Sequence, residues 1–359
     1  MLVGLCTDEI NNQKNVSHRV LSLHGSGKEY FFLQLKEHNI DVINLAKSKY
    51  NILFILIKLF YYVCRIKSYD VLHFHLRYST RFGSIIKSII AADKPSVTSV
   101  YEQKHQSPGT YTIFSKLKSR IDIFVALSGL DKRDLISTGI PLEKVELILP
   151  HIDIEGANSD YNNTRNALLK QYDIPDDSFI MLCVARLHKD RLLHRIIEIL
   201  PAVIQNGIKV TLLLVGDGPL KNELSDFAKD IRVENNIKWA GIRYDIWNIF
   251  PGSDLYLTFS VDDIVSFAAI QAMACSCPVV AFNIKPMSEK EQLCEYRGYF
   301  ITTRDKESFS EVVCRFLKNE EMRKEFGRKA QENVNQDKTI KKDSSVLSYI
   351  ELYEKLVAL

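Results

Sequence analysis

Several features that identify other classes of protein are missing from this 359-residue sequence. It contains seven cysteines but no Cys-x-x-Cys pair, and no further His or Cys stands at zinc spacing from the close pair Cys275 and Cys277. Most of the cysteines lie in apolar stretches, as buried reduced thiols do, which favours a reducing compartment over a disulfide framework. We find no internal repeat, no low-complexity segment and no nucleic-acid-binding motif.

Long apolar runs and a secretory leader are also missing. Residues Met1 to Cys6 lack the basic start of a signal peptide, so we expect a cytoplasmic protein. The most apolar segment, Asn51 to Lys67, has an apolar run too short to span a bilayer. Two interpretations stay open for it: a buried helix, or an interfacial helix with Arg65 and Lys67 near lipid headgroups on the inner face of the cell membrane.

The charges are unevenly divided along the chain. The net charge is +3, but residues 1–153 hold 20 Lys and Arg against 14 Asp and Glu, a net +6, whereas the remainder holds 27 against 30, a net −3. A basic N-terminal half is compatible with an anionic membrane surface or a phosphate-bearing acceptor, and equally with a chance asymmetry of the surface.

Short apolar strands alternate with helical stretches throughout, which predicts an α/β fold with parallel sheets and crossover helices. The length suits two domains. We place them at 1–153 and 154–340, with a linker from His151 to about Leu169 and a last helix in 341–359 that returns to the N-terminal domain. The expected strands are Leu2–Cys6, Ile40–Leu45, Asp70–His75, Pro95–Val100, Ile121–Leu127, Lys144–Leu149, Phe179–Val184, Val210–Val215, Ile237–Trp239, Leu255–Thr258, Val279–Phe282 and Tyr299–Ile301, and the expected helices include Tyr30–His38, Arg81–Ala91, Leu192–Gln205, Leu220–Lys229, Ala268–Ala274 and Ser308–Lys318.

An acidic loop stands directly before a helix at Asp262 to Phe282, and the helix leads through a Cys-Pro turn into an apolar strand. The free N–H groups of a helix N-terminus suit an anionic or hydroxyl-rich ligand. The segment resembles the donor-binding signature of family-4 glycosyltransferases, in which two acidic residues stand eight positions apart. Here Asp263 keeps the first carboxylate and Gln271 replaces the second. The resemblance implies that Asp263 orients the donor sugar, that Gln271 faces the ribose, and that the loop residues Ile264, Val265 and Ser266 line the donor site.

A second motif carries two arginines at a strand-to-helix turn, Arg186 and Arg191. Guanidinium groups match phosphate oxygens well, so the pair can hold a pyrophosphate. The stretch resembles the family's Gly-Arg-Leu-x-x-x-Lys-Gly motif, with Arg191 in the Lys position and Ala185 and Leu192 replacing the glycines.

Weaker motifs complete the resemblance. The tight turn that begins at Gly216 permits close backbone approach, and Ile242 and Arg243 follow a glycine at the position where relatives contact the nucleobase. In the first half, the strand that ends at His75 resembles the family's His-x-His strand, which makes His75 a candidate on the acceptor side; a hydrogen-bonded core histidine is the alternative. The family's early Gly-Gly loop is replaced by residues 11–15.

Together these residues predict the GT-B fold, two Rossmann-like domains facing across a cleft. The resemblance implies a retaining hexosyltransferase that moves a sugar from a UDP- or GDP-linked donor to a glycan or lipid-linked glycan in surface polysaccharide biosynthesis, such as lipopolysaccharide or capsule. It implies no metal and no other cofactor, since Arg186 and Arg191 would neutralise the leaving diphosphate. Two alternatives remain: a catalytically degenerate assembly partner, which Gln271 favours, and a GT-B nucleotide-sugar epimerase.

Overall fold

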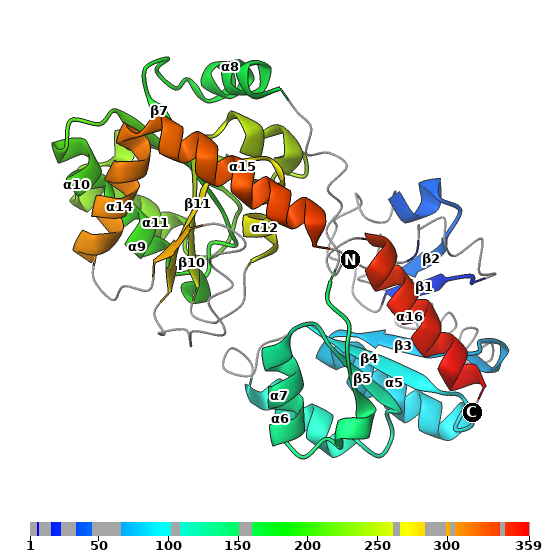
Figure 1. Cartoon of the computed structure of the whole chain (residues 1–359). Coiled ribbons are helices and arrows are strands. Elements are labelled where there is room, and N and C mark those ends of the chain that lie inside the picture. Colours follow the sequence, from blue (N-terminus) through cyan, green and yellow to red (C-terminus); the bar gives the residue numbers. More distant parts are fainter. Residues whose placement is uncertain are drawn as a thin grey trace. The chain divides into compact units, whose positions relative to one another are not determined.

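The structure is a computed structural model, and it describes residues 6, 16–22, 34–44, 66–101, 108–150, 160–260, 266–283, 299–301, 306–337 and 342–358. The chain divides into two compact units (Figure 1). One consists of Met1–His151 together with Thr339–Leu359, and the other of Ile152–Lys338. The N-terminal unit is therefore assembled from both ends of the sequence.

The C-terminal unit is built on one parallel six-stranded sheet, with the strand order β12-β11-β10-β7-β8-β9. This confirms the predicted α/β class. Its strands are β7 Phe179–Val184, β8 Val210–Val215, β9 Ile237–Gly241, β10 Leu255–Ser260, β11 Val279–Asn283 and β12 Tyr299–Ile301. Its helices are α8 Tyr161–Tyr172, α9 Leu193–Glu198, α10 Leu200–Gln205, α11 Lys221–Asp230, α12 Phe267–Ala274, α14 Lys306–Lys318 and α15 Glu320–Gln336.

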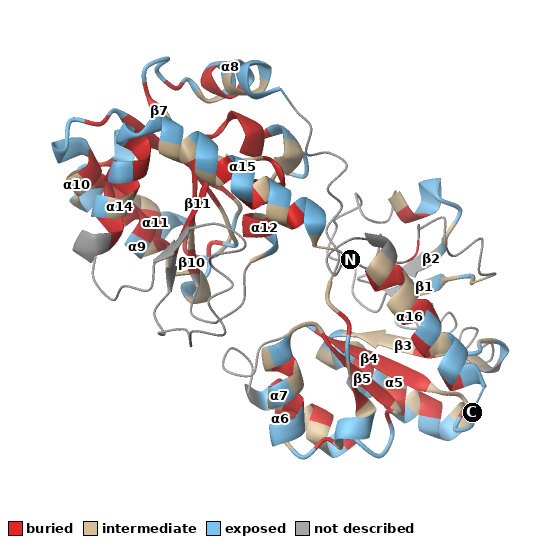
Figure 2. Cartoon of the chain, viewed as in Figure 1, coloured by how far each residue is buried: buried red, intermediate tan, exposed pale blue. Residues whose placement is uncertain are grey.

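Both faces of this sheet are covered, as its continuous apolar strands require. In β7, Met181 and Cys183 face a core cluster to which α9, α10, α11 and α14 contribute, and the alternate residues Ile180 and Leu182 are fully buried as well (Figure 2). Helix α12 lies against β10 and β11, and α15 packs on α12. The last contact is close, because a Cβ at Gly327 would lie 2.0 Å from the Ser276 carbonyl oxygen.

A buried carboxylate ties α8 to this sheet. Asp254 Oδ2 accepts hydrogen bonds from Arg165 Nη1 at 2.6 Å and from the Ile180 N–H at 2.7 Å, and Oδ1 accepts from the Tyr161 hydroxyl at 3.2 Å. Arg165 also donates to the Ser178 carbonyl at 2.8 Å. The side chains of Asp254 and Arg165 are only 6% and 16% exposed, so each charge depends on the other for its solvation.

The N-terminal unit has a parallel four-stranded sheet, with the order β3-β4-β5-β6, and a parallel strand pair, β1 with β2. The strands are β1 Arg19–Ser22, β2 Asp41–Asn44, β3 Leu72–His75, β4 Ser96–Val100, β5 Ile123–Ala126 and β6 Val145–Leu147, and the helices include α5 Leu76–Ile90, α6 Pro108–Leu117, α7 Gly129–Ser137 and α16 Lys342–Val357.

The two faces of the four-stranded sheet are covered by different parts of the chain. Residues of α6 and α7 pack with Phe124 and Ala126 of β5, whereas α16 packs on the opposite face against Val97, Ile123 and Val125. The last helix is thus an integral part of the N-terminal core.

Helix α5 follows β3 without an intervening loop. The turn is made by Leu76, which has a left-handed backbone at φ 70°, and the helix packs so closely on β3 that a Cβ at Gly83 would lie 2.2 Å from the Phe74 ring. The sequence pattern placed the start of this helix at Arg81, five residues too late. The pattern missed this start because the strand and helix share a boundary that no Gly, Pro or Asn marks.

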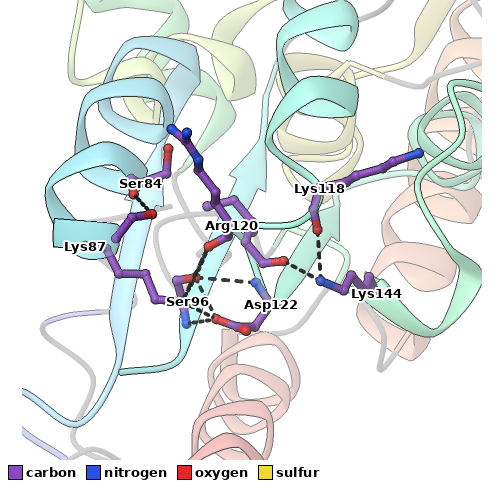
Figure 3. A network of polar contacts seen from close by, with 9 residues as sticks. Ser84, Lys87, Ser96, Lys118, Arg120, Asp122 and Lys144 are labelled. Carbon is purple, nitrogen blue, oxygen red and sulfur yellow. Dashed lines mark hydrogen bonds and ion pairs between the residues drawn. The ribbon is translucent and has the colours of Figure 1, made fainter. Parts of the chain in front are cut away.

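A buried lysine anchors α5 to the edge of the sheet (Figure 3). Lys87 Nζ donates to Asp122 Oδ2 at 2.8 Å and to the Ser96 hydroxyl at 3.2 Å, and Asp122 also accepts from the Ser96 N–H at 2.8 Å. Burial alone would raise the pKa of Asp122, but its hydrogen bonds with Lys87 and Ser96 outweigh this and lower it. The Asp122 carboxylate therefore stays ionised, and its bond with Lys87 fixes the rotation of the helix about its axis.

Two further predictions of local structure are wrong, and two others concern residues that the structure does not describe. The expected linker is wrong beyond Ser159, because Asp160 caps the N-terminus of α8 through bonds to the N–H groups of Asn162 and Asn163. The single helix expected from Leu192 to Gln205 is two helices, α9 and α10, with Pro201 in the first turn of the second. The expected strand at Leu2–Cys6, except Cys6, and segment 51–65 lie outside the described residues. None of the helices in the described part of the chain is long and apolar enough to span a bilayer.

Candidate functional site

The loops that follow β7, β8 and β9 meet at the carboxyl edge of the six-stranded sheet. The Gly216 N–H donates to the Gly241 carbonyl at 2.7 Å, which joins the loops after β8 and β9. The Leu187 N–H donates to the Asp217 carbonyl at 3.1 Å, which joins the loops after β7 and β8. In parallel α/β sheets this edge is where ligands bind, so the geometry marks the region in which to look for a site.

Two glycines allow this close contact between loops. Gly216 has φ 140°, and a Cβ there would lie 1.9 Å from the Ala185 carbonyl oxygen. A Cβ at Gly218 would lie 2.4 Å from the Leu187 carbonyl oxygen. Neither position accepts a side chain without moving backbone, so the predicted tight turn at Gly216 has a steric reason: it braces the loop that carries Arg186.

The two predicted phosphate-binding arginines are brought together by an aspartate that lies between them. Asp190 Oδ2 accepts from Arg186 Nη2 at 3.1 Å and lies 3.5 Å from Arg191 Nε, while Oδ1 accepts from His188 Nδ1 at 2.6 Å. The Arg186 side chain is 65% exposed and that of Asp190 only 13%. With the exposed Lys189, the loop carries three fixed cations against one carboxylate, an excess of positive charge suited to a diphosphate.

Asp190 holds this loop in its charged form. Burial alone would raise the pKa of its carboxyl, but the hydrogen bond with His188 and the charges of Arg191 and Arg186 outweigh that effect and lower the pKa. An ionised Asp190 orients the guanidinium groups before any ligand arrives, which reduces the ordering cost of binding. Asp190 and His188 were not predicted from the sequence, although an acid directly beside Arg191 was a visible signal.

Ser266, which was predicted to line the donor site, stands directly before α12. Its hydroxyl accepts from the Ala269 N–H at 3.2 Å and so caps the helix N-terminus. Gln271 lies farther along the helix and is partly exposed, and its backbone carbonyl accepts from the Cys275 N–H. Ser266 therefore has a structural role, as the cap of α12, that does not depend on any ligand.

Tyr256 connects the arginine loop to α12. This buried residue of β10 donates its hydroxyl to the Val184 carbonyl at 3.4 Å, at the end of β7. Burial raises the pKa of Tyr256, whereas a hydrogen bond with Ser266 and the charge of Arg191 oppose the rise. Arg191 and Ser266 thus lie around the same phenol. Our sequence analysis missed Tyr256, because in sequence it is one aromatic residue within a buried strand.

Ile242 and Arg243 occupy the turn after β9. Ile242 is 47% exposed, so its side chain is free to cover a ligand. The Arg243 guanidinium binds the Asp245 carboxylate through Nε at 2.7 Å and through Nη2, and donates to the Tyr172 hydroxyl at 2.7 Å. The hydrogen bond with Arg243 lowers the pKa of Asp245. Arg243 therefore has a bidentate partner within its own turn, and its contribution to a site would fall to the backbone.

The remaining predicted residues of the donor loop, Asp263, Ile264 and Val265, lie outside the described residues. Within the described ranges, no group of three or more His, Cys, Asp or Glu side chains is placed to hold a metal ion.

His75 belongs to the N-terminal unit, where it ends β3. Its ring lies 4.1 Å from that of His73, centroid to centroid, and its Nδ1 is 2.8 Å from the Tyr101 hydroxyl. Burial lowers the pKa of His75 to about 4, and the charge of His18 acts in the same direction. His75 is therefore neutral near pH 7, a state that suits hydrogen bonding to a hydroxyl and not electrostatic attraction of an anion.

His73 is a structural residue by comparison. Its Nδ1 lies 2.6 Å from the Tyr353 hydroxyl of α16, and its Nε2 lies 2.8 Å from the Ser99 hydroxyl. Both ring nitrogens are thus occupied. Burial lowers its pKa well below the ordinary value, and the neighbouring His75 adds to this. The last helix therefore holds His73, whose ring lies against that of His75.

The backbone at Leu192 allows a direct test of strain in the arginine loop. Leu192 has φ 48° and ψ 35°, a left-handed conformation. Glycine adopts it readily, and the motif that this loop resembles has glycine at this position. We expect Leu192→Gly to be about 1 kcal/mol more stable than Leu192→Ala, because both lose the leucine side chain and only alanine keeps the strain. At Ala202 in α10, Ala202→Gly should be destabilising by about 1 kcal/mol instead. Urea unfolding of all three variants measures this, and an alanine variant as stable as the glycine variant would contradict it.

Comparison with known proteins agrees with this geometry. Residues 164–333, which include both arginines, match the family model described as glycosyl transferases group 1. The crystal structure of the Anabaena protein HepE in complex with UDP and glucose superposes with a TM-score of 0.81 at 20% identity, covering 99% of this chain and 95% of that one. A glycosyltransferase from Rickettsia africae superposes with a TM-score of 0.72 at 16% identity, covering 99% and 93%. The match to the group 1 glycosyl transferase model thus lies within the C-terminal unit, and the chain as a whole has the GT-B fold of these structures.

Sequence relatives match over a smaller share of the chain. The N-acetyl-alpha-D-glucosaminyl L-malate synthase of Bacillus anthracis is 23% identical over 215 residues, which is 57% of this chain and 56% of that protein. The UDP-Gal:alpha-D-GlcNAc-diphosphoundecaprenol alpha-1,3-galactosyltransferase of Escherichia coli is 25% identical over 300 residues, 79% of this chain and 74% of that protein. The match thus spans little more than half the length of the first relative.

Proposed function

We propose that this protein transfers a hexose or hexosamine from a nucleotide-sugar donor to a hydroxyl group of a glycan or lipid-linked glycan, with retention of the anomeric configuration. The observation that carries the proposal is the cluster of Arg186 and Arg191 around Asp190 at the carboxyl edge of the sheet. UDP is the favoured nucleotide, because HepE has been seen with UDP-glucose and the E. coli relative is named for UDP-Gal. The lipid-diphosphate acceptor in that relative's name supports a lipid-linked acceptor here.

The proposed division of labour follows the chemistry of a diphosphate leaving group. As the bond between the anomeric carbon and the phosphate oxygen breaks, negative charge grows on the diphosphate, and Arg186 and Arg191 stabilise it. The acceptor oxygen forms the new bond on the same face of the sugar, and its proton leaves with the diphosphate. We assign Asp263 to orienting the sugar, Gln271 to a ribose hydroxyl, and the loop from Ile264 to Ser266 to the donor.

The acceptor side is proposed to lie in the N-terminal unit. His75 is the candidate there, since a neutral imidazole can accept a hydrogen bond from the acceptor hydroxyl. We propose surface polysaccharide assembly on the inner face of the cell membrane as the setting. The names of two relatives, a diphosphoundecaprenol galactosyltransferase and an amylovoran biosynthesis glycosyltransferase, support the lipid-linked glycan.

A second candidate, a binding partner without transferase activity, is favoured by one observation. Gln271 stands where the resembling motif has a carboxylate, and an amide accepts a hydrogen bond from ribose without the help of charge. The two candidates differ in turnover, so an activity measurement separates them.

The test measures release of nucleoside diphosphate from a panel of UDP- and GDP-sugars, with and without a lipid-diphosphate-linked sugar as acceptor. We expect release that depends on the acceptor. Gln271→Glu should bind the donor about fivefold more tightly, because the restored carboxylate makes a charge-assisted bond to the ribose.

Three other outcomes would each displace the proposal. Binding of a nucleotide sugar without turnover, unrescued by Gln271→Glu, would establish the inactive partner. Conversion of the donor to another nucleotide sugar without any acceptor would establish an epimerase. No binding of any donor would place the function outside this site.

A further inference from the structure

Helix α5 presents its apolar side to solvent and its polar side to the protein. The exposed residues include Tyr78, Phe82, Ile85 and Ile89, which are 61%, 55%, 38% and 77% exposed. Their spacing of four, three and four residues places them in one row along the helix, called here the α5 stripe. A helix that only had to cover its sheet would show the reverse arrangement, and no contact within the described part of the chain accounts for the stripe.

The opposite side of the helix is buried and polar. Thr80, Ser84 and Lys87 are at most 6% exposed. The Thr80 hydroxyl lies 3.1 Å from the Thr98 hydroxyl of β4, and Lys87 is bound to Asp122 in the network of Figure 3. Rotating the helix about its axis to bury the stripe would separate the Lys87 charge from its partner Asp122, which is costly. The polar contacts therefore lock the stripe outward.

The charge around the stripe is positive. Helix α5 contains Arg77 and Arg81 beside the stripe and no acidic residue. The Arg77 guanidinium lies 4.7 Å from the centre of the Tyr78 ring and donates to the Tyr78 hydroxyl at 2.9 Å.

This combination decides what covers the stripe. A row of Tyr, Phe and Ile flanked by arginines has the composition of a helix that lies in the plane of a membrane surface, with apolar side chains in the acyl boundary and cations at anionic headgroups. Helix α5 has no acidic residue to match these cations, so the partner must supply the negative charge, as an anionic bilayer does.

We propose that α5 docks this protein on an anionic lipid bilayer through the α5 stripe, with Arg77 and Arg81 at the headgroups. The α5 stripe consists of other residues than the segment 51–67, for which the sequence suggested interfacial contact. It also goes beyond the proposed transferase activity and does not depend on it, because binding to lipid requires neither donor nor acceptor. It supplies a reason for an enzyme with a lipid-linked acceptor to stay beside its substrate.

The experiment is co-sedimentation of the full chain with phosphatidylcholine vesicles, with and without phosphatidylglycerol, at low and at high salt. We expect binding to the anionic vesicles that weakens in high salt, since the attraction is screened within a Debye length. The double variant Phe82→Ser with Ile89→Ser should lower the partition coefficient at least about tenfold, because it removes two apolar anchors. Arg81→Glu should abolish the preference for anionic over neutral vesicles.

Leu142→Ser is the matched control. Leu142 lies in the same unit, is 61% exposed and stands outside α5, so its replacement should leave vesicle binding unchanged. Circular dichroism and thermal unfolding check that each variant is folded, which is expected because the replaced side chains are exposed.

Several results would overturn the proposal. They are no binding to anionic vesicles at low salt, equal binding to neutral vesicles, or wild-type binding by the double serine variant. A dimer that the double variant dissolves, without vesicle binding by the wild type, would show that the stripe is a contact between copies of the chain. All readouts are of binding, so loss of transfer activity alone would not affect the outcome.

Discussion

Replacing both arginines of the β7 loop, Arg186→Ala with Arg191→Ala, should abolish measurable sugar transfer. Each single replacement removes hydrogen bonds to a charged group and should weaken binding of the nucleoside diphosphate by about 1.5–3 kcal/mol, or roughly 10- to 150-fold. The loss of binding free energy in the double variant should be smaller than the sum of the two single losses. Both side chains contact the Asp190 carboxylate, so removing one changes how the other is oriented.

Calorimetric titration with UDP and with GDP measures this effect directly. Arg191→Lys is expected to be mild, since the motif that this loop resembles carries lysine at that position. Arg195→Ala is the matched control, because Arg195 is 59% exposed on α9 and pairs with Glu198 at 3.1 Å. Unchanged diphosphate affinity in both single alanine variants would refute the phosphate site, and a loss in the Arg195 variant of the same size would show that only general surface charge matters.

Replacement of Asp254 should have the largest effect on stability. In Asp254→Ala the buried Arg165 guanidinium and the Ile180 N–H both lose their acceptor. Removing one partner of a buried ion pair costs about 3–5 kcal/mol, which is a large part of the stability of a domain. We expect a clear fall in the urea midpoint of the C-terminal unit.

Asp177→Ala provides the control for this prediction. Asp177 also pairs with a cation, Lys209, but both side chains are largely exposed, so its removal should hardly change the midpoint. If the Asp254 variant unfolds at the same urea concentration as the Asp177 variant, the buried pair contributes nothing beyond a surface pair and the interpretation of α8 as anchored through Asp254 is wrong.

Strands β7 and β8 were predictable because each combines nearly continuous burial with a sharp end. Strands β7, β8 and β12 have the predicted bounds, and β10 and β11 extend only slightly past them. An apolar run buried on both faces and ended by Gly, Pro or a charge has few other interpretations. The arginine pair was predictable for the same reason, since it directly follows such a strand.

Other features depend on contacts that no local pattern records. Helix α8 was taken for part of a linker because its surface is polar and only Leu168 and Leu169 are buried. The carboxylate of Asp254, which helps to attach it to the sheet, lies 85 residues beyond Leu169. The outward stripe on α5 is set by Lys87 and Asp122, which are 35 residues apart. The left-handed turn at Leu192 was hidden because no glycine marks it.

The order in which the two units can finish folding during synthesis follows from the position of α16. The C-terminal unit, Ile152–Lys338, is continuous and can close its core as soon as it has been synthesised. The N-terminal unit, although made first, must wait: one face of its sheet stays open until Val346, Tyr349 and Ile350 arrive to cover Val97 and Val125. During translation the earlier half is therefore the more exposed to aggregation, and the later half completes folding first.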